Sequence, residues 1–151
     1  MRVLMVCLGN ICRSPMAEYV LRHLAARAGV GDRLVVDSAA TSRYQIGETP
    51  HAETRRILAA HGIPCGNHRA RQMTRADYDR YDLILGMDGE NRYDILRIVR
   101  RDPQHKVRLL LDWSERPRDI ADPWYTGDFE MTYADVLEGC ESLLAYITQQ
   151  E

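Results

Sequence analysis

The segment 7–15, CLGNICRSP, holds a nucleophilic sulfur together with groups that bind an anion. Five residues separate Cys7 from Arg13, and this spacing lets the intervening backbone curl until its N–H groups and the guanidinium face one point. Pro15 is well placed as the first residue of a helix with Ser14 as its cap, so the positive end of the helix dipole also faces the loop. Such a site favours a phosphate-sized dianion, and the same field stabilises Cys7 as a thiolate near neutral pH.

The turn residues of this segment fit that geometry. A loop that points its amides inward needs residues that tolerate left-handed dihedrals, as Gly9 and Asn10 do. The nucleotide-binding P-loop is a different motif, because it needs a second glycine followed by Lys and Ser or Thr. A buried cysteine at a strand end, followed by an ordinary turn, is the simpler alternative. The order of nucleophile, turn residues, cation and helix start favours the anion site.

A second segment, 119–125, supplies a candidate acid. A thiolate that attacks phosphorus expels a phenolic oxygen more readily when a carboxylic acid protonates that oxygen. Pro123 imposes an extended or turn geometry on Asp122, and the aromatic rings of Trp124 and Tyr125 offer a flat apolar surface beside it. By itself, an Asp-Pro turn followed by aromatics is typical of a loop that precedes a helix. This segment becomes a candidate for the general acid only because the loop 7–15 indicates phosphate chemistry.

Length and composition predict a single domain over residues 1–151, with a hydrophobic core large enough to be stable without disulfide bonds or a structural metal ion. The 20 basic and 22 acidic residues give a net charge of −2, so no global field favours nucleic acid or an anionic membrane. Four cysteines in a charged chain of this size do not suggest a secreted disulfide framework. The apolar run after Arg2 is too short for a signal peptide or a membrane span. We therefore expect a soluble, cytoplasmic protein without membrane insertion.

The hydrophobic pattern predicts the α/β fold class, because short apolar runs alternate with helical periods. Strands are expected at Val3 to Val6, Leu34 to Asp37, Leu83 to Gly86 and Val107 to Leu111. Helices are expected from Pro15 to Gly29, from Pro50 to near Gly62, after Asp88 as N-cap, and from about Thr132 to about Gln149. This order places Cys7 at the carboxyl end of the first strand, where open α/β sheets bind ligands.

Several separated motifs together resemble one known family. They are the loop Cys7 to Pro15, the pairs Asp37-Ser38 and Met87-Asp88, the stretch His68-Arg69-Ala70-Arg71-Gln72, and the turn Asp122-Pro123. In this order they resemble the low-molecular-weight protein tyrosine phosphatase family over essentially the whole chain. The resemblance implies a phosphotyrosine phosphatase I-like fold, a four-stranded parallel sheet in the order 2-1-3-4 with helices on both faces. It also implies a reaction without metal or cofactor.

The resemblance also implies roles for individual residues. Cys7 would attack phosphorus to form a phosphocysteine, while Arg13 and the loop amides hold the phosphate oxygens. Asp122 would protonate the tyrosine oxygen and then activate water, and the Ser14 hydroxyl would help the sulfur to leave. The implied substrate-binding residues are Leu8, Gly9, Asn10, Ile11, Cys12, Ser14, Tyr44, Trp124 and Tyr125. Asn10, Ser38 and His68 would form the hydrogen-bond network that keeps the loop in shape.

The pocket walls should decide which phosphoester enters. By resemblance, an apolar slot formed by Ile11, Tyr44, Trp124 and Tyr125 admits a phenyl ring and is too deep for a serine phosphate to reach the sulfur. Relatives that act on phosphoarginine carry Thr at the position of Ile11. Many family members have two tyrosines after the Asp-Pro pair, whereas this chain has Trp124 first.

Cys12 has two interpretations. Two sulfurs on one tight loop can meet when oxidised, and the family supports a reversible Cys7–Cys12 disulfide that protects the nucleophile. The alternative is a small residue that packs the loop, since proximity alone does not ensure disulfide geometry.

Two other clusters have plain interpretations. His61, Cys65 and His68 lack a fourth ligand nearby in sequence, so no metal site is expected. A basic run comprises Arg97, Arg100, Arg101, His105 and Lys106. Because this run is interrupted by Asp102 and Pro103 and has no interleaved aromatics, it favours a solvated helix end over a nucleic-acid site.

Two other functions stay open at this stage. Thioredoxin-coupled arsenate reductases share the loop and fold, but they need two further cysteines around the third strand, and the segment 78–87 has none. A phosphate-binding module without catalysis would be expected to lack the nucleophile, the clamp or the acid. The expected partner is a tyrosine-phosphorylated protein, and a tyrosine kinase of the same cell and the proteins of a host are both candidates. Exposed rings around the pocket are compatible with a monomer or with weak self-association.

Overall fold

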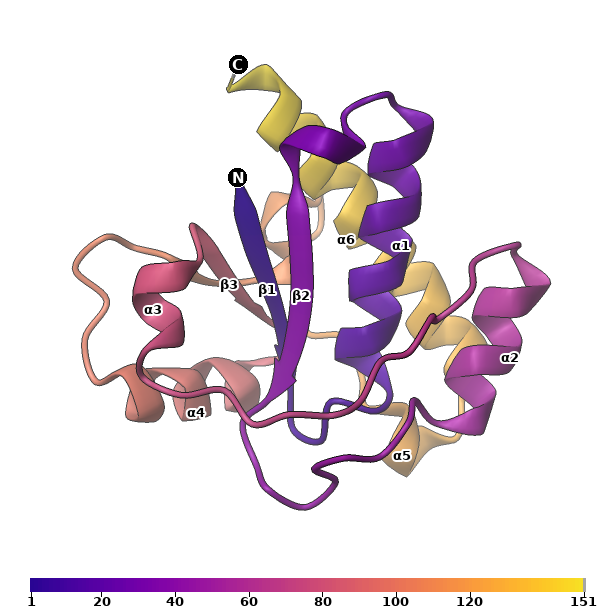
Figure 1. Cartoon of the computed structure of the whole chain (residues 1–151), viewed down its shortest axis with the longest axis horizontal. Helices are drawn as coiled ribbons and strands as arrows, with labels where there is room; N and C mark the ends of the chain where they lie inside the picture. Colours follow the sequence, from indigo (N-terminus) through magenta and orange to yellow (C-terminus); the bar gives the residue numbers. More distant parts are fainter. Residues whose placement is uncertain (151) are drawn as a thin grey trace.

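The computed structural model describes residues 1–150 and contains a four-stranded parallel sheet in the order β2-β1-β3-β4 (Figure 1). The strands are β1 (Arg2–Cys7), β2 (Val35–Ala40), β3 (Leu83–Gly86) and β4 (Val107–Leu109). The helices are α1 (Arg13–Arg27), α2 (Ala52–Ala60), α3 (Asp77–Arg80), α4 (Gly89–Val99), α5 (Pro123–Thr126) and α6 (Phe129–Gln149), with 3₁₀ turns at Gly31–Arg33 and Leu110–Trp113. The predicted sheet order and fold class are confirmed.

Helices cover both faces of the sheet, and β1 shows why its sequence is apolar throughout. Val3 and Met5 face the core beneath α1 and α6, whereas Leu4 and Val6 face the core beneath α3 and α4. Figure 1 shows α1 and α6 on one side of the sheet and α3 and α4 on the other. A strand that is buried on both faces has no polar alternation, which is typical of parallel sheets.

The start of α1 differs from the prediction. The helix begins at Arg13 and Cys12 is its N-cap, so Ser14 is not the cap, and no side chain caps this end. The Ser14 hydroxyl lies within hydrogen-bond distance of Cys7 and Asn10 instead, at 3.0 and 2.8 Å. The N-terminus of α1 therefore presents its free N–H groups to the loop, as expected for an anion site.

The bounds of β2, β4 and α6 also differ from the prediction, each for a local reason. Strand β2 continues to Ala40 because residues 38–40 pair with β1, although they carry no β-branched side chain. Strand β4 ends at Leu109, where the Asp112 carboxylate accepts the Leu109 N–H and stabilises a 3₁₀ turn. Helix α6 begins at Phe129, three residues before the predicted start, because the Asp128 carboxylate accepts the Met131 N–H.

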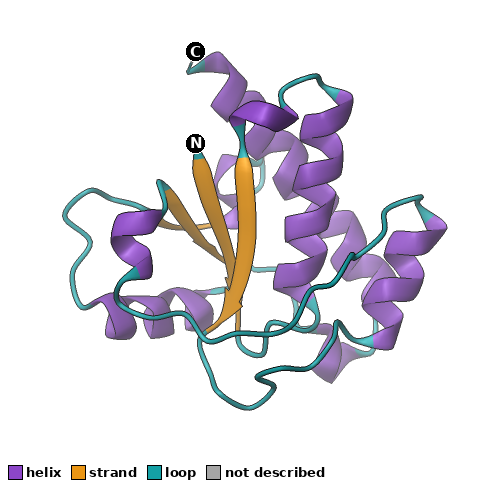
Figure 2. Cartoon of the chain, in the orientation of Figure 1, coloured by secondary structure: helices purple, strands orange, loops and turns teal. Residues whose placement is uncertain are grey.

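Helix α2 begins at Ala52, two residues after the predicted Pro50, because His51 is its N-cap and accepts the Glu53 N–H. The helix signals at Gly29, Gly62 and Asp88 are confirmed. Gly29 and Gly62 follow α1 and α2 with φ of 76° and 74°, and Asp88 caps α4 by accepting the Asn91 N–H at 2.7 Å. The loops that follow the carboxyl ends of the strands gather at the lower edge of the sheet in Figure 2. Within residues 1–150, no helix is both long enough and apolar enough to cross a lipid bilayer.

Candidate active site

The loop 7–14 connects the end of β1 to the first turn of α1 and curls around the sulfur of Cys7. The Asn10 N–H points at the Cys7 Sγ at 3.2 Å, and the Ser14 Oγ lies 3.0 Å from the same atom. Asn10 has φ of 58°, the left-handed conformation predicted for a turn residue of this loop. A backbone N–H and a hydroxyl therefore point at the sulfur from the curled loop, a geometry that suits the oxygens of a phosphoryl group.

The Asn10 side chain supports this turn from beneath. Its Nδ2 donates to Ser14 Oγ at 2.8 Å and to Ser38 Oγ at 2.9 Å, and its Oδ1 accepts the Arg71 N–H at 3.1 Å. The Nε2 of His68 lies 3.1 Å from the Asn10 carbonyl oxygen. The structure thus brings together Asn10, Ser38 and His68, the three predicted supporting residues. The left-handed turn at Asn10 is held by contacts from β2 and from residues 68–71.

Glu18 completes this network and was not predicted. The Ser38 hydroxyl donates to its Oε1 at 2.5 Å, and Arg22 pairs with its Oε2 at 2.6 Å. Burial raises the pKa of this carboxyl, while the Ser38 hydrogen bond and the Arg22 charge act in the opposite direction. In the sequence, Glu18 and Arg22 look like an ordinary exposed i,i+4 pair, so no local signal indicates burial.

The guanidinium of Arg13 is held between two segments. Its Nη1 donates to the Asp88 carboxylate at 2.6 Å and to the Ile120 carbonyl at 2.7 Å, and its Nη2 is 3.4 Å from Asp122. Asp88 uses one oxygen for this pair and the other to cap α4. Arg13 is 2% exposed, so its planar donor fork is fixed in one orientation.

Asp122 occupies the N-cap of the short helix α5. Its Oδ1 accepts the Trp124 N–H at 3.0 Å, and its extended backbone before Pro123 has φ of −80° and ψ of 114°. The carboxyl is therefore both a helix cap, which is the ordinary interpretation of an Asp-Pro turn, and a wall of the cavity above Cys7.

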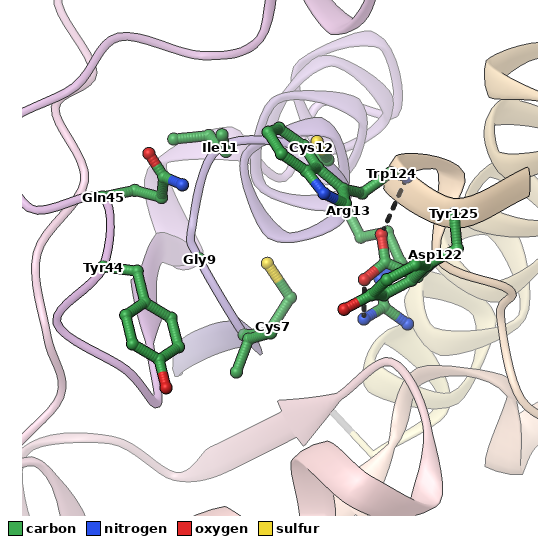
Figure 3. A pocket seen from close by; sticks show the side chains of 11 residues that line it. Cys7, Gly9, Ile11, Cys12, Arg13, Tyr44, Gln45, Asp122, Trp124 and Tyr125 are labelled. Atoms are coloured by element: carbon green, nitrogen blue, oxygen red, sulfur yellow. Dashed lines mark hydrogen bonds and ion pairs between the residues drawn. The ribbon is translucent and has the colours of Figure 1, made fainter. Parts of the chain in front are cut away.

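A cavity of about 210 Å³ opens above the sulfur (Figure 3). It is lined by Cys7, Leu8, Gly9, Ile11, Cys12, Arg13, Tyr44, Gln45, Asp122, Trp124 and Tyr125. In Figure 3, Tyr44 and Gln45 stand on one side of the opening, and Trp124 and Tyr125 stand on the other. The lining is mainly apolar, and its polar groups include the sulfur, the guanidinium, the Asp122 carboxyl and the Gln45 amide. Such a space suits a flat ring that carries an anion at its deep end.

The comparison with known proteins agrees with this geometry. Residues 2–151 match the sequence model described as low molecular weight phosphotyrosine protein phosphatase. The chain belongs to this family. The low molecular weight protein-tyrosine-phosphatase YfkJ of Bacillus subtilis is 41% identical over 151 residues, which cover 99% of this chain and 97% of YfkJ. The low molecular weight phosphotyrosine protein phosphatase of Rattus norvegicus is 42% identical over 147 residues, 94% of this chain and 92% of that protein.

Solved structures of this phosphatase family have the same fold. The crystal structure of YfkJ matches with a TM-score of 0.97 at 40% identity and covers 100% of this chain and 96% of YfkJ. The crystal structure of a Drosophila arginine phosphatase matches with a TM-score of 0.89 at 34% identity, over 97% of this chain and 98% of that one. The chain is therefore an enzyme of the low molecular weight protein-tyrosine-phosphatase class.

Within this phosphatase fold, the predicted site residues fall into two layers. Asn10 and Ser14 were predicted to bind substrate, but their side chains lie under the loop and do not line the cavity. Gln45 lines the cavity and was not predicted, because nothing in its sequence context distinguishes it from other loop residues. Gln45 approaches the loop so closely that a Cβ added at Gly9 would lie 3.2 Å from the Gln45 Cγ.

Cys12 and Cys7 both have free thiols in this structure. Burial raises the pKa of the Cys12 thiol to about 12, and the nearby Cys7 and Asp122 act in the same direction. These effects favour the neutral thiol of Cys12 at physiological pH.

The potential metal ligands singled out in the sequence have other contacts. The His61 ring stacks on Tyr133 with centroids 4.1 Å apart, and His68 contacts Asn10. In the described chain, no three His, Cys, Asp or Glu side chains are grouped so that they could hold a metal ion.

Proposed function

We propose that this phosphatase hydrolyses phosphotyrosine monoesters of proteins through a phosphocysteine intermediate. The observation that carries the proposal is the cavity above the Cys7 sulfur, which has the Arg13 guanidinium and the Asp122 carboxyl in its walls and aromatic rings at its mouth. Nucleophile, anion clamp and acid lie around a single space, as a displacement at phosphorus requires.

In the first step, the Cys7 thiolate attacks phosphorus and forms the S–P bond while the bond to the phenolic oxygen breaks. The loop N–H groups and Arg13 bind the equatorial oxygens, where negative charge concentrates in the transition state. The Asp122 carboxylic acid transfers its proton to the departing oxygen, so tyrosine leaves as a neutral phenol. Arg13 Nη1 keeps its bonds to Asp88 and Ile120, and the longer 3.4 Å contact of Nη2 to Asp122 leaves this nitrogen available to the phosphate.

In the second step, water attacks the phosphocysteine. Asp122, now a carboxylate, accepts a proton from this water, the S–P bond breaks, and inorganic phosphate is released. The Ser14 hydroxyl, 3.0 Å from the sulfur, stabilises the thiolate that leaves. The same carboxyl serves as acid and then as base, so the cycle returns the enzyme to its starting protonation.

The cavity also favours phosphotyrosine over shorter phosphoesters. Its mouth is flanked by Tyr44, Trp124 and Tyr125, and Ile11 contributes to its wall, so a phenyl ring would fill the space between phosphate and surface. A serine phosphate has no ring to bridge that depth. Its main chain would have to enter the apolar slot, where backbone polar groups lose hydration without gaining partners.

Phosphoarginine is a second candidate substrate. It is favoured by the similarity to the Drosophila arginine phosphatase structure, with a TM-score of 0.89. In this chain the relevant wall position is Ile11, whose apolar side chain offers no hydrogen bond to a guanidinium. We therefore expect the aryl ester to be the better substrate.

The proposal is tested with p-nitrophenyl phosphate and with matched phosphotyrosine, phosphoserine and phosphoarginine peptides, all in the presence of a chelator. The wild type should hydrolyse the two aryl esters. Cys7→Ser should lose at least about 10⁴-fold in turnover, and Asp122→Asn about 10²- to 10³-fold.

Asp119→Asn is the matched control, because Asp119 is a nearby carboxylate that does not line the cavity and accepts the Gly89 N–H. This variant should keep nearly all activity. Absence of phosphate release from every substrate would exclude the proposal, and preference for phosphoarginine would replace it with the second candidate.

A further inference from the structure

A second hollow adjoins the phosphotyrosine slot. It has a volume of about 360 Å³ and lies between the segment 41–44, which follows β2, and the helix α4. Leu8 and Tyr44 line both this hollow and the cavity above Cys7. We call it the α4 groove; its other wall is formed by Asp94, Arg97 and Ile98 of α4. The two spaces thus share a wall at Leu8 and Tyr44.

The charged side chains at the α4 groove have no ion-pair partner among the described residues. Arg97 is exposed and its guanidinium lies over the Tyr93 ring at 5.9 Å, but over residues 1–150 it pairs with no carboxylate. Arg43, between two lining residues, is also exposed and unpaired there.

The balance of these charges indicates the sign of the missing partner. Arg97 lines the groove and the exposed Arg43 belongs to the segment that forms its other wall, against one lining carboxylate, Asp94; none of the three is ion-paired among the described residues. The apolar side chains of Leu8 and Ile98 form part of the same wall. A ligand that complements this surface carries negative charge together with some apolar area.

We propose that the α4 groove binds the substrate polypeptide on one side of the phosphotyrosine and selects acidic residues there. This inference rests on the proposed function, because a phosphotyrosine ring in the slot leaves its own main chain at the mouth, beside Tyr44. An extended chain advances about 3.3 Å per residue, so about three residues on that side reach along the groove. Arg97 contacts their carboxylates and acts as a specificity-determining residue.

The test uses peptides with one Asp at each of the three positions before or after phosphotyrosine, in an alanine background. For the wild type, Asp on one side only should raise kcat/KM about fivefold, the effect of an exposed ion pair. Arg97→Glu should abolish this preference and favour Lys at the same positions. Hydrolysis of p-nitrophenyl phosphate, which cannot reach the groove, should stay within about twofold.

Arg92→Glu is the matched control. It makes the same charge change on the same helix, but Arg92 lies about 200° around the helix from Asp94, so it faces away from the groove. This variant should keep the wild-type peptide preference. An unchanged preference in Arg97→Glu, or an equal loss in Arg92→Glu, would overturn the inference.

Failure of the proposed function gives a different pattern. In that case no variant hydrolyses p-nitrophenyl phosphate, and the same peptides are then measured by direct binding to the wild type and to Arg97→Glu. Selective weakening of the acidic peptides in Arg97→Glu would support the groove as a binding surface without catalysis. Equal affinities would overturn the groove inference as well.

Discussion

The two halves of the active site are built in opposite ways. The loop 7–14 is closed in, and Asn10, Arg13 and Ser14 are at most 2% exposed. The segment that carries Asp122 is open, since Trp124 and Tyr125 are 58% and 77% exposed. The loop binds the phosphoryl group, which is the same in every substrate. The aromatic rings contact the leaving group and the surface of the substrate protein, which differ from one substrate to another.

The two halves also differ in what holds them. Side chains or backbone from β2, from residues 68–71 and from Asp88, the N-cap of α4, support the loop. The acid segment is held by the Ile120 N–H, which donates to the Met87 carbonyl at 2.9 Å, by the bond from Arg13 to the Ile120 carbonyl, and by the Gly89 N–H, which donates to Asp119 at 3.1 Å. The His51 ring also meets the Trp124 ring edge-on. Changes in the loop should therefore reduce activity on all substrates and lower stability, while changes at the rings should affect aryl substrates only.

The largest effect is expected from Arg13→Lys. A lysine keeps the charge but lacks the planar fork in which one nitrogen binds Asp88 and the Ile120 carbonyl while the other faces the phosphate. We expect kcat/KM to fall about 10²- to 10³-fold for every substrate, and the free energy of unfolding to fall by roughly 1–3 kcal/mol. Steady-state kinetics and urea unfolding measure both.

Arg56→Lys is the comparison for this change, because Arg56 forms an exposed pair with Glu53. It should leave both quantities nearly unchanged. If Arg13→Lys slowed aryl substrates alone, the loop 7–14 would not act on every substrate alike. The proposed division between this loop and the segment 119–125 would then be wrong.

Asn10→Ala should have the next largest effect. The substitution removes the bonds to Ser14, Ser38 and Arg71 and places alanine at φ of 58°. We expect the free energy of unfolding to fall by about 2–4 kcal/mol and turnover to fall about 10- to 100-fold. Chemical unfolding and assays with p-nitrophenyl phosphate measure these changes.

Asn10→Gly separates the two causes. Glycine accepts the left-handed conformation but supplies none of the side-chain bonds. It should be about 1 kcal/mol more stable than Asn10→Ala while losing comparable activity. Equal stability of the two variants would mean that backbone strain contributes nothing at this position.

The same division decides what the sequence could predict. The reacting groups were predictable because Cys7, Arg13 and the turn residues between them stand on one short segment, where spacing determines geometry. Strands β1 and β3 were predictable because buried parallel strands are continuous apolar runs. Asp122 could be recognised only after the loop had indicated phosphate chemistry.

The supporting contacts were harder to predict, because they join segments far apart in the chain. Glu18 looks like half of a surface ion pair until α1 packs against β2, and the pairing partner of Ser38 in β1 is Met5, not a sequence neighbour. Ser14 looked like a helix cap because Ser before Pro is a common cap, but its hydroxyl is turned to the sulfur. Tertiary contacts, not propensity, decide these positions.

The smallest effect is expected at His51, and it should be confined to the open half of the site, the segment that carries Asp122, Trp124 and Tyr125. Its ring stacks on Phe129, with centroids 4.8 Å apart, and meets the Trp124 ring edge-on at 6.1 Å, while its Nδ1 accepts the Glu53 N–H and caps α2. His51 thus acts as a positioning residue for one wall of the slot. His51→Asn can keep the cap but removes the ring. We expect KM for aryl phosphates to rise about two- to fivefold, with kcat nearly unchanged.

His51→Phe makes the reciprocal change, because it keeps an aromatic ring against Trp124 but cannot accept the Glu53 N–H. It should keep a KM near that of the wild type and lose about 1 kcal/mol of stability through the missing cap. Tryptophan fluorescence in a Trp113→Phe background reports the Trp124 environment directly and should change in His51→Asn only. Equal rises in KM for both variants would show that the helix cap, not the ring contact, holds the wall, and the open half of the site would then depend on α2 as the closed half depends on β2.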